Sequence, residues 1–167
     1  AAAAWAMAMG AWRFFHNEAV ALAAAYDVVR AAVRAALGAP GACYVVHDVS
    51  LLDFSSHAAK RDRAAIGDGN GRGYELYTAL VLTATGRAVG PLFQELRATA
   101  GCYSSEPLTP REARRGVARF VGHLEQLEKA VGAIARHLAG WAVVHLADRE
   151  FDDLLAQRGL HAQGLRY

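Results

Sequence analysis

The chain has 167 residues, enough for one domain with its own hydrophobic core. Its 18 Lys and Arg residues against 16 Asp and Glu residues leave a net charge of +2, which excludes the strong basic excess of a protein that coats nucleic acid. Any contact with DNA must therefore come from local basic patches. The hydrophobic fraction is 54%, but much of it is alanine, so the core must be built from the larger Leu, Val, Ile, Phe and Trp side chains.

The cysteines and the N-terminal run argue against a secreted or membrane-spanning protein. Cys43 and Cys102 stand far apart with no metal-ligand spacing, so neither a disulfide framework nor a zinc site is predicted, and a reducing cytoplasmic setting is expected. The run AAAAWAMAMGAW is shorter than a membrane span and follows no basic leader. We expect residues 1–16 to be a tail or the edge of a fragment, either helical or poorly ordered.

The first half of the chain contains one helical pattern and one strand pattern. Asn17 can cap an amphipathic helix that runs to about Leu37. The continuous apolar run of residues 43–48 predicts a strand that is buried on both faces and ends on Asp48. The polar, glycine-rich residues 53–73 predict a loop.

A hairpin and a long helix are expected next. Residues 74–83 and 88–96 predict two strands joined by a tight glycine turn. Pro91 cannot donate a hydrogen bond to a neighbouring strand, so the second of these strands is expected to be the outermost. Thr109 predicts the start of one long helix with a single buried face. Its apolar stripe consists of Val117, Phe120, Leu124, Leu127, Val131, Ile134 and Leu138.

The C-terminal part predicts a fourth strand at residues 141–148, which is again apolar and again ends on aspartate. A short helix near Glu150 and the start of another strand at Gly164 should follow. Because the long helix can act as a right-handed crossover, the first and fourth strands are expected to be parallel neighbours. The predicted fold class is α/β, with a mixed five-stranded sheet flanked by helices, and residues 17–167 form one partial domain.

The two strands that end on Asp48 and Asp148 are the main chemical feature. The carboxyl ends of parallel strands meet at one edge of an α/β sheet, where ligands bind. Two carboxylates held close together repel each other unless a cation lies between them. Oxygen ligands suit magnesium or manganese, and such a site can hold two metal ions for attack at phosphorus. The alternative is that each aspartate only caps the turn that follows it.

Several ordered blocks of sequence resemble the DDE transposases of bacterial insertion sequences, specifically the insertion-sequence-four family. The resemblance covers Trp12 to Tyr167. The blocks are HDVSLLDFS at residues 47–55, GYELY at 73–77, TG at 85–86, GPLFQ at 90–94 and DREFD at 148–152.

The resemblance implies a ribonuclease-H-like catalytic core with Asp48 and Asp148 as catalytic residues that bind magnesium or manganese. It implies metal-dependent DNA strand cleavage and strand transfer. The implied partners are double-stranded DNA, as transposon ends and target, and a second copy of the protein in a homodimer. The implied location is the bacterial cytoplasm, in association with the nucleoid.

The chain departs from the family pattern at three places. Val49 and Ser50 follow the first aspartate, where the family usually has threonine, and Tyr77 stands where the second strand commonly carries histidine. The family's third catalytic residue is a glutamate on a later helix, beyond the last residue of this chain. Glu150 is not assigned that role, and we expect the chain alone to be catalytically incomplete.

Basic residues near the two aspartates are candidate DNA contacts. Arg149 follows the second aspartate, and Lys60, Arg61 and Arg63 lie in the loop after the first. They could neutralise backbone phosphates without reading sequence. The alternatives are a local ion pair for Arg149 and a solvated surface loop for the other three. The same choice between DNA phosphate contacts and a solvated surface applies to four residues near the start of the long helix, Arg111, Arg114, Arg115 and Arg119.

Other motifs are given structural interpretations. His47 and His145 are predicted to be buried structural histidines rather than metal ligands. The glycine run from Gly67 to Gly73 lacks the lysine of a phosphate-binding loop, so no nucleotide site is predicted. Two other functions stay open: a catalytically dead remnant that binds DNA or regulates a full-length transposase, and another metal nuclease on the same type of sheet.

Overall fold

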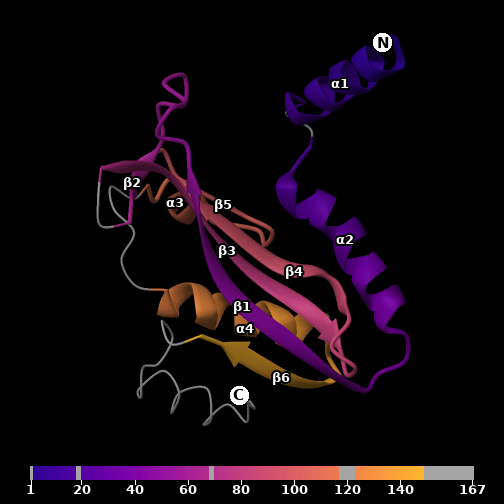
Figure 1. Cartoon of the computed structure of the whole chain (residues 1–167). Helices are drawn as coiled ribbons and strands as arrows, with labels where there is room; N and C mark the ends of the chain where they lie inside the picture. Colours follow the sequence, from indigo (N-terminus) through magenta and orange to yellow (C-terminus); the bar gives the residue numbers. More distant parts are fainter. Residues whose placement is uncertain (1, 18–19, 68–69, 117–122, 149–167) are drawn as a thin grey trace.

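The computed structural model describes residues 2–17, 20–67, 70–116 and 123–148. The helices are α1 (Ala2–Phe15), α2 (Leu22–Leu37), α3 (Pro110–Ala113) and α4 (Leu124–His137). The strands are β1 (Ala42–Asp53), β2 (Ala64–Ile66), β3 (Gly71–Thr83), β4 (Ala88–Arg97), β5 (Cys102–Ser104) and β6 (Ala142–Ala147). Figure 1 shows a twisted sheet with α4 packed against it and α1 standing apart from it.

The strands form one mixed, open sheet with the order β5-β4-β3-β1-β6, and β2 pairs with β3. Strands β1 and β6 pair in parallel. The pairs β1–β3, β3–β4 and β4–β5 are antiparallel. The predicted hairpin and the parallel first and fourth strands are therefore confirmed. The strands β2 and β5 were not anticipated, so the sheet has six strands within the described residues, where four had been predicted. The helix expected near Glu150 and the strand expected at Gly164 lie outside the described residues.

The first strand is longer than predicted. It continues through Asp48 to Asp53, because β3 pairs with it along its whole length, from Cys43 opposite Thr83 to Asp53 opposite Gly73. The prediction that this strand ends on Asp48 is therefore wrong. The predicted strand and the predicted loop leave residues 49–52 between them unassigned, and backbone pairing with β3 makes these residues part of the strand.

Gly67 directly follows β2, and Gly71 and Gly73 lie in β3, so the predicted loop of residues 53–73 is interrupted by strand residues. Residues 68–69 of the glycine run lie outside the described residues. Gly73 lies where the β1 backbone approaches β3 most closely, since a Cβ atom there would come 2.0 Å from the Leu52 carbonyl oxygen. Gly67 has a positive φ of 62°, a conformation that glycine adopts without strain. These glycines have a local structural role in the hairpin.

Pro91 is at the edge of the sheet, as predicted. Its register partner is Leu80 of β3, next to an irregularity in the pairing. On the other side of β4, the short strand β5 pairs only with residues Glu95 to Arg97. The prediction that the second hairpin strand, β4, is outermost is thus correct at Pro91 and wrong from Glu95 to Arg97, where β5 pairs with it.

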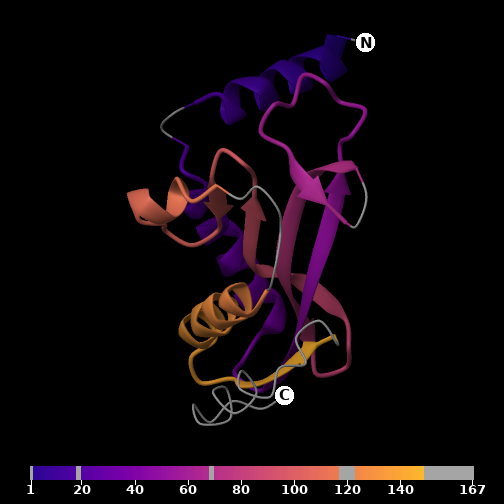
Figure 2. The same ribbon diagram turned by 90° about the vertical axis from the view of Figure 1, so that its left-hand side faces the viewer.

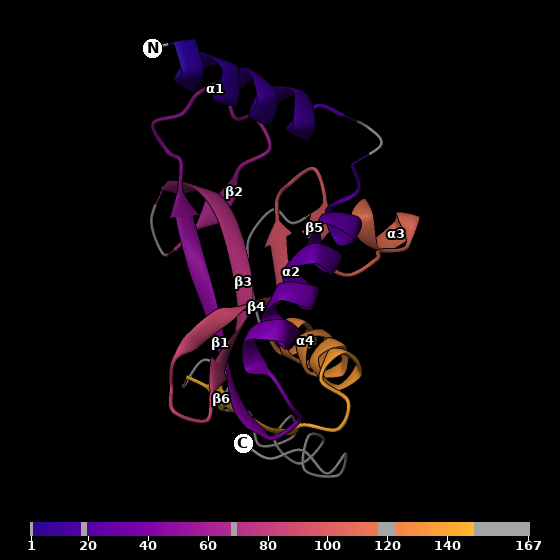
Figure 3. The same cartoon turned by 90° about the vertical axis from the view of Figure 1, so that its right-hand side faces the viewer.

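The helix predicted from Asn17 begins later. Helix α2 starts at Leu22 after Ala21, and no side chain caps it. It ends at Gly38, which has a φ of 81°, and it packs along β4 (Figure 3). Residues before Phe15 form helix α1, the first of the two possibilities for this segment. Within the described part of the chain, no helix combines the length and apolar character needed to span a bilayer.

The single long helix predicted from Thr109 is wrong. The capping box of Thr109 and Glu112 is present, but α3 ends at Ala113, and α4 begins at Leu124. The backbone at residues 113–116 lies against the turn at residues 99–101: a Cβ atom at Gly116 would come 1.9 Å from the Thr99 carbonyl oxygen. This backbone contact replaces a continuous helix with a turn.

The hydrophobic core lies between the sheet and α4, which Figure 2 shows against one side of the strands. We call this side the covered face. Val45, Tyr77 and Phe93 are buried on it, and Leu127, Val131, Ile134 and Leu138 of α4 are buried against it. The part of the predicted apolar stripe that lies in α4 is therefore confirmed.

The opposite side of the sheet, which we call the open face, carries the residues that alternate with these. Along β1, the buried residues Cys43, Val45 and His47 alternate with Tyr44 and Asp48, which are exposed. At the edge strand, Leu146 is 42% exposed. The prediction that the first strand is buried on both faces is therefore wrong: α4 covers one face, whereas on the open face α2 reaches β4 and leaves Tyr44 and Asp48 of β1 exposed.

Candidate functional site

Asp48 and Asp148 belong to adjacent parallel strands. The register of β1 and β6 ends with His47 opposite Ala147, and each aspartate is the residue that follows. Neighbouring strands lie about 4.8 Å apart, so the two carboxylates start from neighbouring backbone positions. Both residues are exposed. The sheet thus brings together the two residues that were predicted to form a site, although β1 runs past the first of them.

Two hydroxyl-bearing residues, Ser50 and Thr78, neighbour Asp48 on the open face. Ser50 Oγ donates a 3.0 Å hydrogen bond to Asp48 Oδ2. Thr78 of β3 is directly opposite Asp48 in the antiparallel register, and opposite side chains in such a pair have Cβ atoms about 5 Å apart. Carboxylate and hydroxyl oxygens are hard ligands that suit magnesium or manganese. Among the described residues, no group of three or more His, Cys, Asp or Glu side chains is placed to hold a metal.

A row of polar side chains continues from Thr78 across the open face. Gln94 of β4 is opposite Thr78, and its Nε2 donates a 3.0 Å hydrogen bond to Thr78 Oγ1. The Tyr26 hydroxyl of α2 donates to Gln94 Oε1. The sequence analysis missed this row, because its members come from three elements and only the strand register aligns them.

His47 and His145 lie on the covered face, directly behind the carboxylates. Both are buried, which confirms their prediction as buried histidines. A 2.8 Å hydrogen bond joins His47 Nε2 to His145 Nδ1, and a second of 2.8 Å joins His47 Nδ1 to the Tyr77 hydroxyl. Burial lowers the pKa of His47 to about 3, with a further contribution from His145, and burial lowers the pKa of His145 to about 4. The neutral ring pair therefore links β1 to β6 just before the two aspartates.

Tyr77 belongs to the histidine pair and not to the carboxylate site. Tyr77 has no exposed surface, and its side chain belongs to the covered face, away from Asp48. Burial raises its pKa, so its hydroxyl stays protonated. The residue therefore supports His47 from within the core and does not belong to the carboxylate site.

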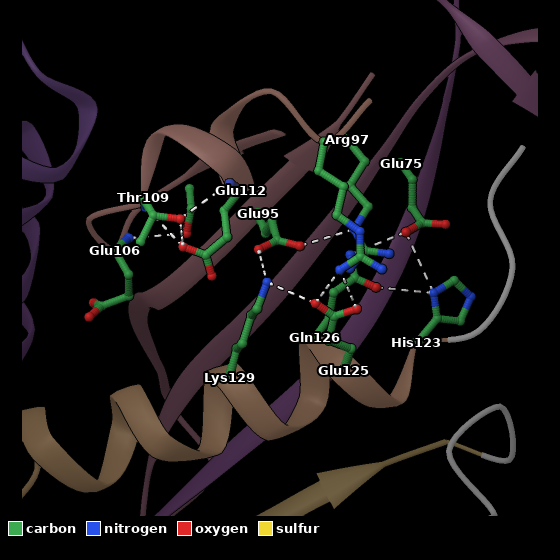
Figure 4. Close-up of polar contacts among 12 residues, drawn as sticks. Glu75, Glu95, Arg97, Glu106, Thr109, Glu112, His123, Glu125, Gln126 and Lys129 are labelled. Atoms are coloured by element: carbon green, nitrogen blue, oxygen red, sulfur yellow. Dashed lines mark hydrogen bonds and ion pairs between the residues drawn. The ribbon is translucent and has the colours of Figure 1, made fainter. Parts of the chain in front are cut away.

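A second polar cluster lies under α4, again on the covered face (Figure 4). Glu75 Oε1 accepts a 3.2 Å hydrogen bond from Gln126 Nε2, and burial is the largest cause of its raised pKa. Glu95 Oε1 accepts a 3.0 Å bond from Arg97, and its Oε2 lies 3.7 Å from Lys129 Nζ. Within the described part of the chain, Glu75 Oε2 and Glu95 Oε2 are buried without a hydrogen bond. This cluster joins the sheet to the helix and is remote from the open face.

The predicted DNA contacts in the loop after β1 have different surroundings. Lys60 Nζ lies 4.8 Å from the centre of the Phe54 ring, and Arg63 donates hydrogen bonds of 2.6 and 3.0 Å to the Phe54 and Ser55 carbonyl oxygens. Arg61 is exposed. Of the three, Arg61 is the one that makes no hydrogen bond, ion pair or ring contact with another described residue. Arg149 lies outside the described residues.

The arginines near α3 also have local partners. Arg114 Nε donates a 3.1 Å hydrogen bond to the Pro110 carbonyl oxygen, and Arg115 pairs with Glu125 at 2.8 Å. Arg111 is exposed, and Arg119 lies outside the described residues. Arg115 therefore takes part in a local ion pair, which neither of its two predicted interpretations had included.

Taken together, the open face presents two exposed carboxylates on parallel strands, with a hydroxyl-bearing residue directly across from one of them. This arrangement can hold a hard divalent cation and an oxygen ligand beside it. In comparisons with known proteins, no family model matches the chain, and no curated protein matches it either. The functional argument therefore rests on the residues themselves.

Proposed function

We propose that the chain is part of the catalytic core of a DDE-type DNA transposase, with a ribonuclease-H-like sheet and a metal site at Asp48 and Asp148. The observation that carries the proposal is the parallel pairing of β1 and β6, in which each aspartate follows the last registered pair. The order of β4, β3, β1 and β6, with a hairpin before the crossover, also supports it. The blocks of sequence around both aspartates add to this support.

In the proposed site, the two aspartates would bind the metal, and their neighbours would hold them in place. Asp48 and Asp148 would hold magnesium or manganese through their carboxylate oxygens. A bound divalent ion supplies Lewis-acid stabilisation of charge on a phosphate and lowers the pKa of a bound water. Ser50 donates to Asp48 Oδ2 and so holds the Asp48 carboxylate in one orientation. His47 and His145 tie the two strands together behind the site.

Double-stranded DNA is the proposed substrate, because the open face leaves both carboxylates accessible to a large ligand. The near-neutral net charge of the chain implies that DNA is held by a few local contacts rather than by a broad basic surface. Arg61 is the best placed of the loop residues for such a contact, since its guanidinium is exposed.

Manganese binding tests the proposed site. Calorimetric titration of Mn²⁺ into the 167-residue chain should be compared with the same titration of Asp48→Ala and Asp148→Ala. Each variant should lose more than about tenfold in affinity, since loss of an outer-shell partner alone costs that much in many metal sites. Both side chains are exposed, so the variants should fold.

Asp53→Ala is the matched control. Asp53 is also an exposed aspartate of β1, but its Oδ1 accepts hydrogen bonds from the Ser55 backbone and hydroxyl. Its removal should leave Mn²⁺ affinity unchanged. If Asp48→Ala and Asp148→Ala bind Mn²⁺ as tightly as the parent, the proposed site is wrong.

A further inference from the structure

Thr78 is the nearest described side chain across the sheet from Asp48, and its position rests on backbone pairing rather than on a flexible loop. The two residues are register partners in β1 and β3, near the middle of an unbroken run of pairs. Thr78 is half-buried on the open face. Thr78 therefore lies directly across from Asp48 of the proposed site, at a backbone position that the sheet holds firmly.

The direction of the hydrogen bonds leaves the Thr78 proton available. Tyr26 donates its hydroxyl proton to Gln94 Oε1, which places the Gln94 amide nitrogen on the side of Thr78. That nitrogen donates to Thr78 Oγ1 at 3.0 Å, so the threonine oxygen acts as the acceptor. A hydroxyl group that accepts in this way still has one proton to donate. Among the described residues, no acceptor takes that proton.

We infer that the Thr78 hydroxyl donates a hydrogen bond to a non-bridging phosphate oxygen of DNA bound at the Asp48 site. This inference rests on the proposed function and adds a substrate contact to it. A phosphate oxygen is a charged acceptor, and hydrogen bonds to charged groups are about twice as strong as neutral ones. The two hydrogen bonds from Tyr26 to Gln94 and from Gln94 to Thr78 orient the Thr78 hydroxyl as a donor before DNA binds.

The test compares DNA affinity and metal affinity in the same set of variants. Binding of a fluorescent DNA duplex in the presence of Ca²⁺ is measured for the parent, Thr78→Val and Thr78→Ser, and Mn²⁺ affinity is measured without DNA. Thr78→Val removes the hydroxyl but keeps the branched shape, so DNA affinity should fall about tenfold, as expected for one hydrogen bond to a charged group. Thr78→Ser keeps the hydroxyl and should retain the parent's DNA affinity. Mn²⁺ affinity should be unchanged in both variants.

Two further variants separate the contact from general damage to β3. Thr83→Val changes a threonine at the far end of the same strand, whose hydroxyl lies 2.9 Å from that of Thr85, and it should leave DNA affinity unchanged. Tyr26→Phe removes the proton that orients Gln94 and should reduce DNA affinity by a smaller factor than Thr78→Val.

The possible failures are distinguishable. If the parent binds Mn²⁺ through Asp48 but Thr78→Val binds DNA as the parent does, or if the parent has no measurable affinity for DNA, the inference is overturned and the metal site stands. If Thr78→Val weakens Mn²⁺ and DNA binding equally, the hydroxyl serves the metal site rather than the phosphate, which also overturns the inference. If Asp48→Ala binds Mn²⁺ as tightly as the parent, both the proposed function and this inference are overturned.

Discussion

On the covered face of the sheet, polar groups are buried and held by their neighbours: His47 bonds to His145 and Tyr77, and Glu95 bonds to Arg97. On the open face, Asp48 is exposed, and Thr78 across from it keeps a proton to donate. The two faces are built from alternate residues of the same strands. The comparison teaches that the polar residues of β1 and β3 have two separate roles, structural on one face and available for a ligand on the other.

The largest expected difference between the faces is in stability. Phe93→Ala removes a ring that is 1% exposed and should lower the free energy of unfolding by about 3–5 kcal/mol. Leu146→Ala removes a side chain of the open face that is 42% exposed and should cost less than about 1 kcal/mol. Urea denaturation at pH 7 measures both values. Similar losses for the two variants would mean that the open face is packed as tightly as the covered one.

An intermediate effect is expected from pH. In the unfolded chain an imidazole titrates near pH 6.5, about the model-peptide value, whereas burial lowers the pKa of His145 to about 4 and that of His47 to about 3. As the pH falls from 6.5 towards 4, the unfolded chain takes up protons that the folded chain does not, so stability should fall through this window and stay constant above it. Urea midpoints at several pH values measure this slope.

Two variants isolate the histidine contribution to that slope. His145→Asn keeps a hydrogen-bonding group near Nδ1 without titrating, so it should flatten the acid loss of stability. Burial raises the pKa of Glu75, so this group makes the folded state more stable as the pH falls, which is the opposite sign. Glu75→Gln should therefore steepen the acid loss. An unchanged slope in His145→Asn would contradict the assignment to the buried pair.

The smallest effect is expected at the loop after β1. Arg61→Ala should leave stability within about 0.5 kcal/mol of the parent and should lower DNA affinity, with a salt dependence reduced by about one phosphate contact. Arg63→Ala should instead lower stability by about 1 kcal/mol, because two carbonyl oxygens lose their donor. Salt titrations of DNA binding and urea denaturation check the two variants. A DNA effect confined to Arg63→Ala would reverse these assignments.

The local patterns of the sequence predicted much of the secondary structure but not the extent of each element. The β3–β4 hairpin was correct, because its turn and strand residues are consistent with one local structure. The break between α3 and α4 was missed, because the apolar stripe runs through it without interruption. The close approach of Gly116 to the Thr99 carbonyl oxygen shows why the helix stops. The spacing of apolar residues along one helix carries no information about such a contact.

The candidate site divides in the same way. Asp48 and Asp148 could be selected from the sequence, because each follows an apolar run and the intervening helix favours a parallel crossover. Thr78 could not be selected, since it lies in an apolar strand and only the strand register shows that it is opposite Asp48. The buried carboxylates Glu75 and Glu95 were missed for a similar reason: charged residues are usually exposed, and only tertiary packing against α4 buries these two.

The sequence by itself determined which segments are apolar enough to form strands and where the two aspartates fall along them, since hydrophobic periodicity and turn residues act over a few positions. The tertiary structure decided which face of each strand is covered and which residues meet across strands. The physical reason is that a strand alternates its side chains between two faces, so its pattern allows either face to be buried until a helix packs on one of them. Helix α4 packs on one face, and Asp48 and Thr78 are left on the other.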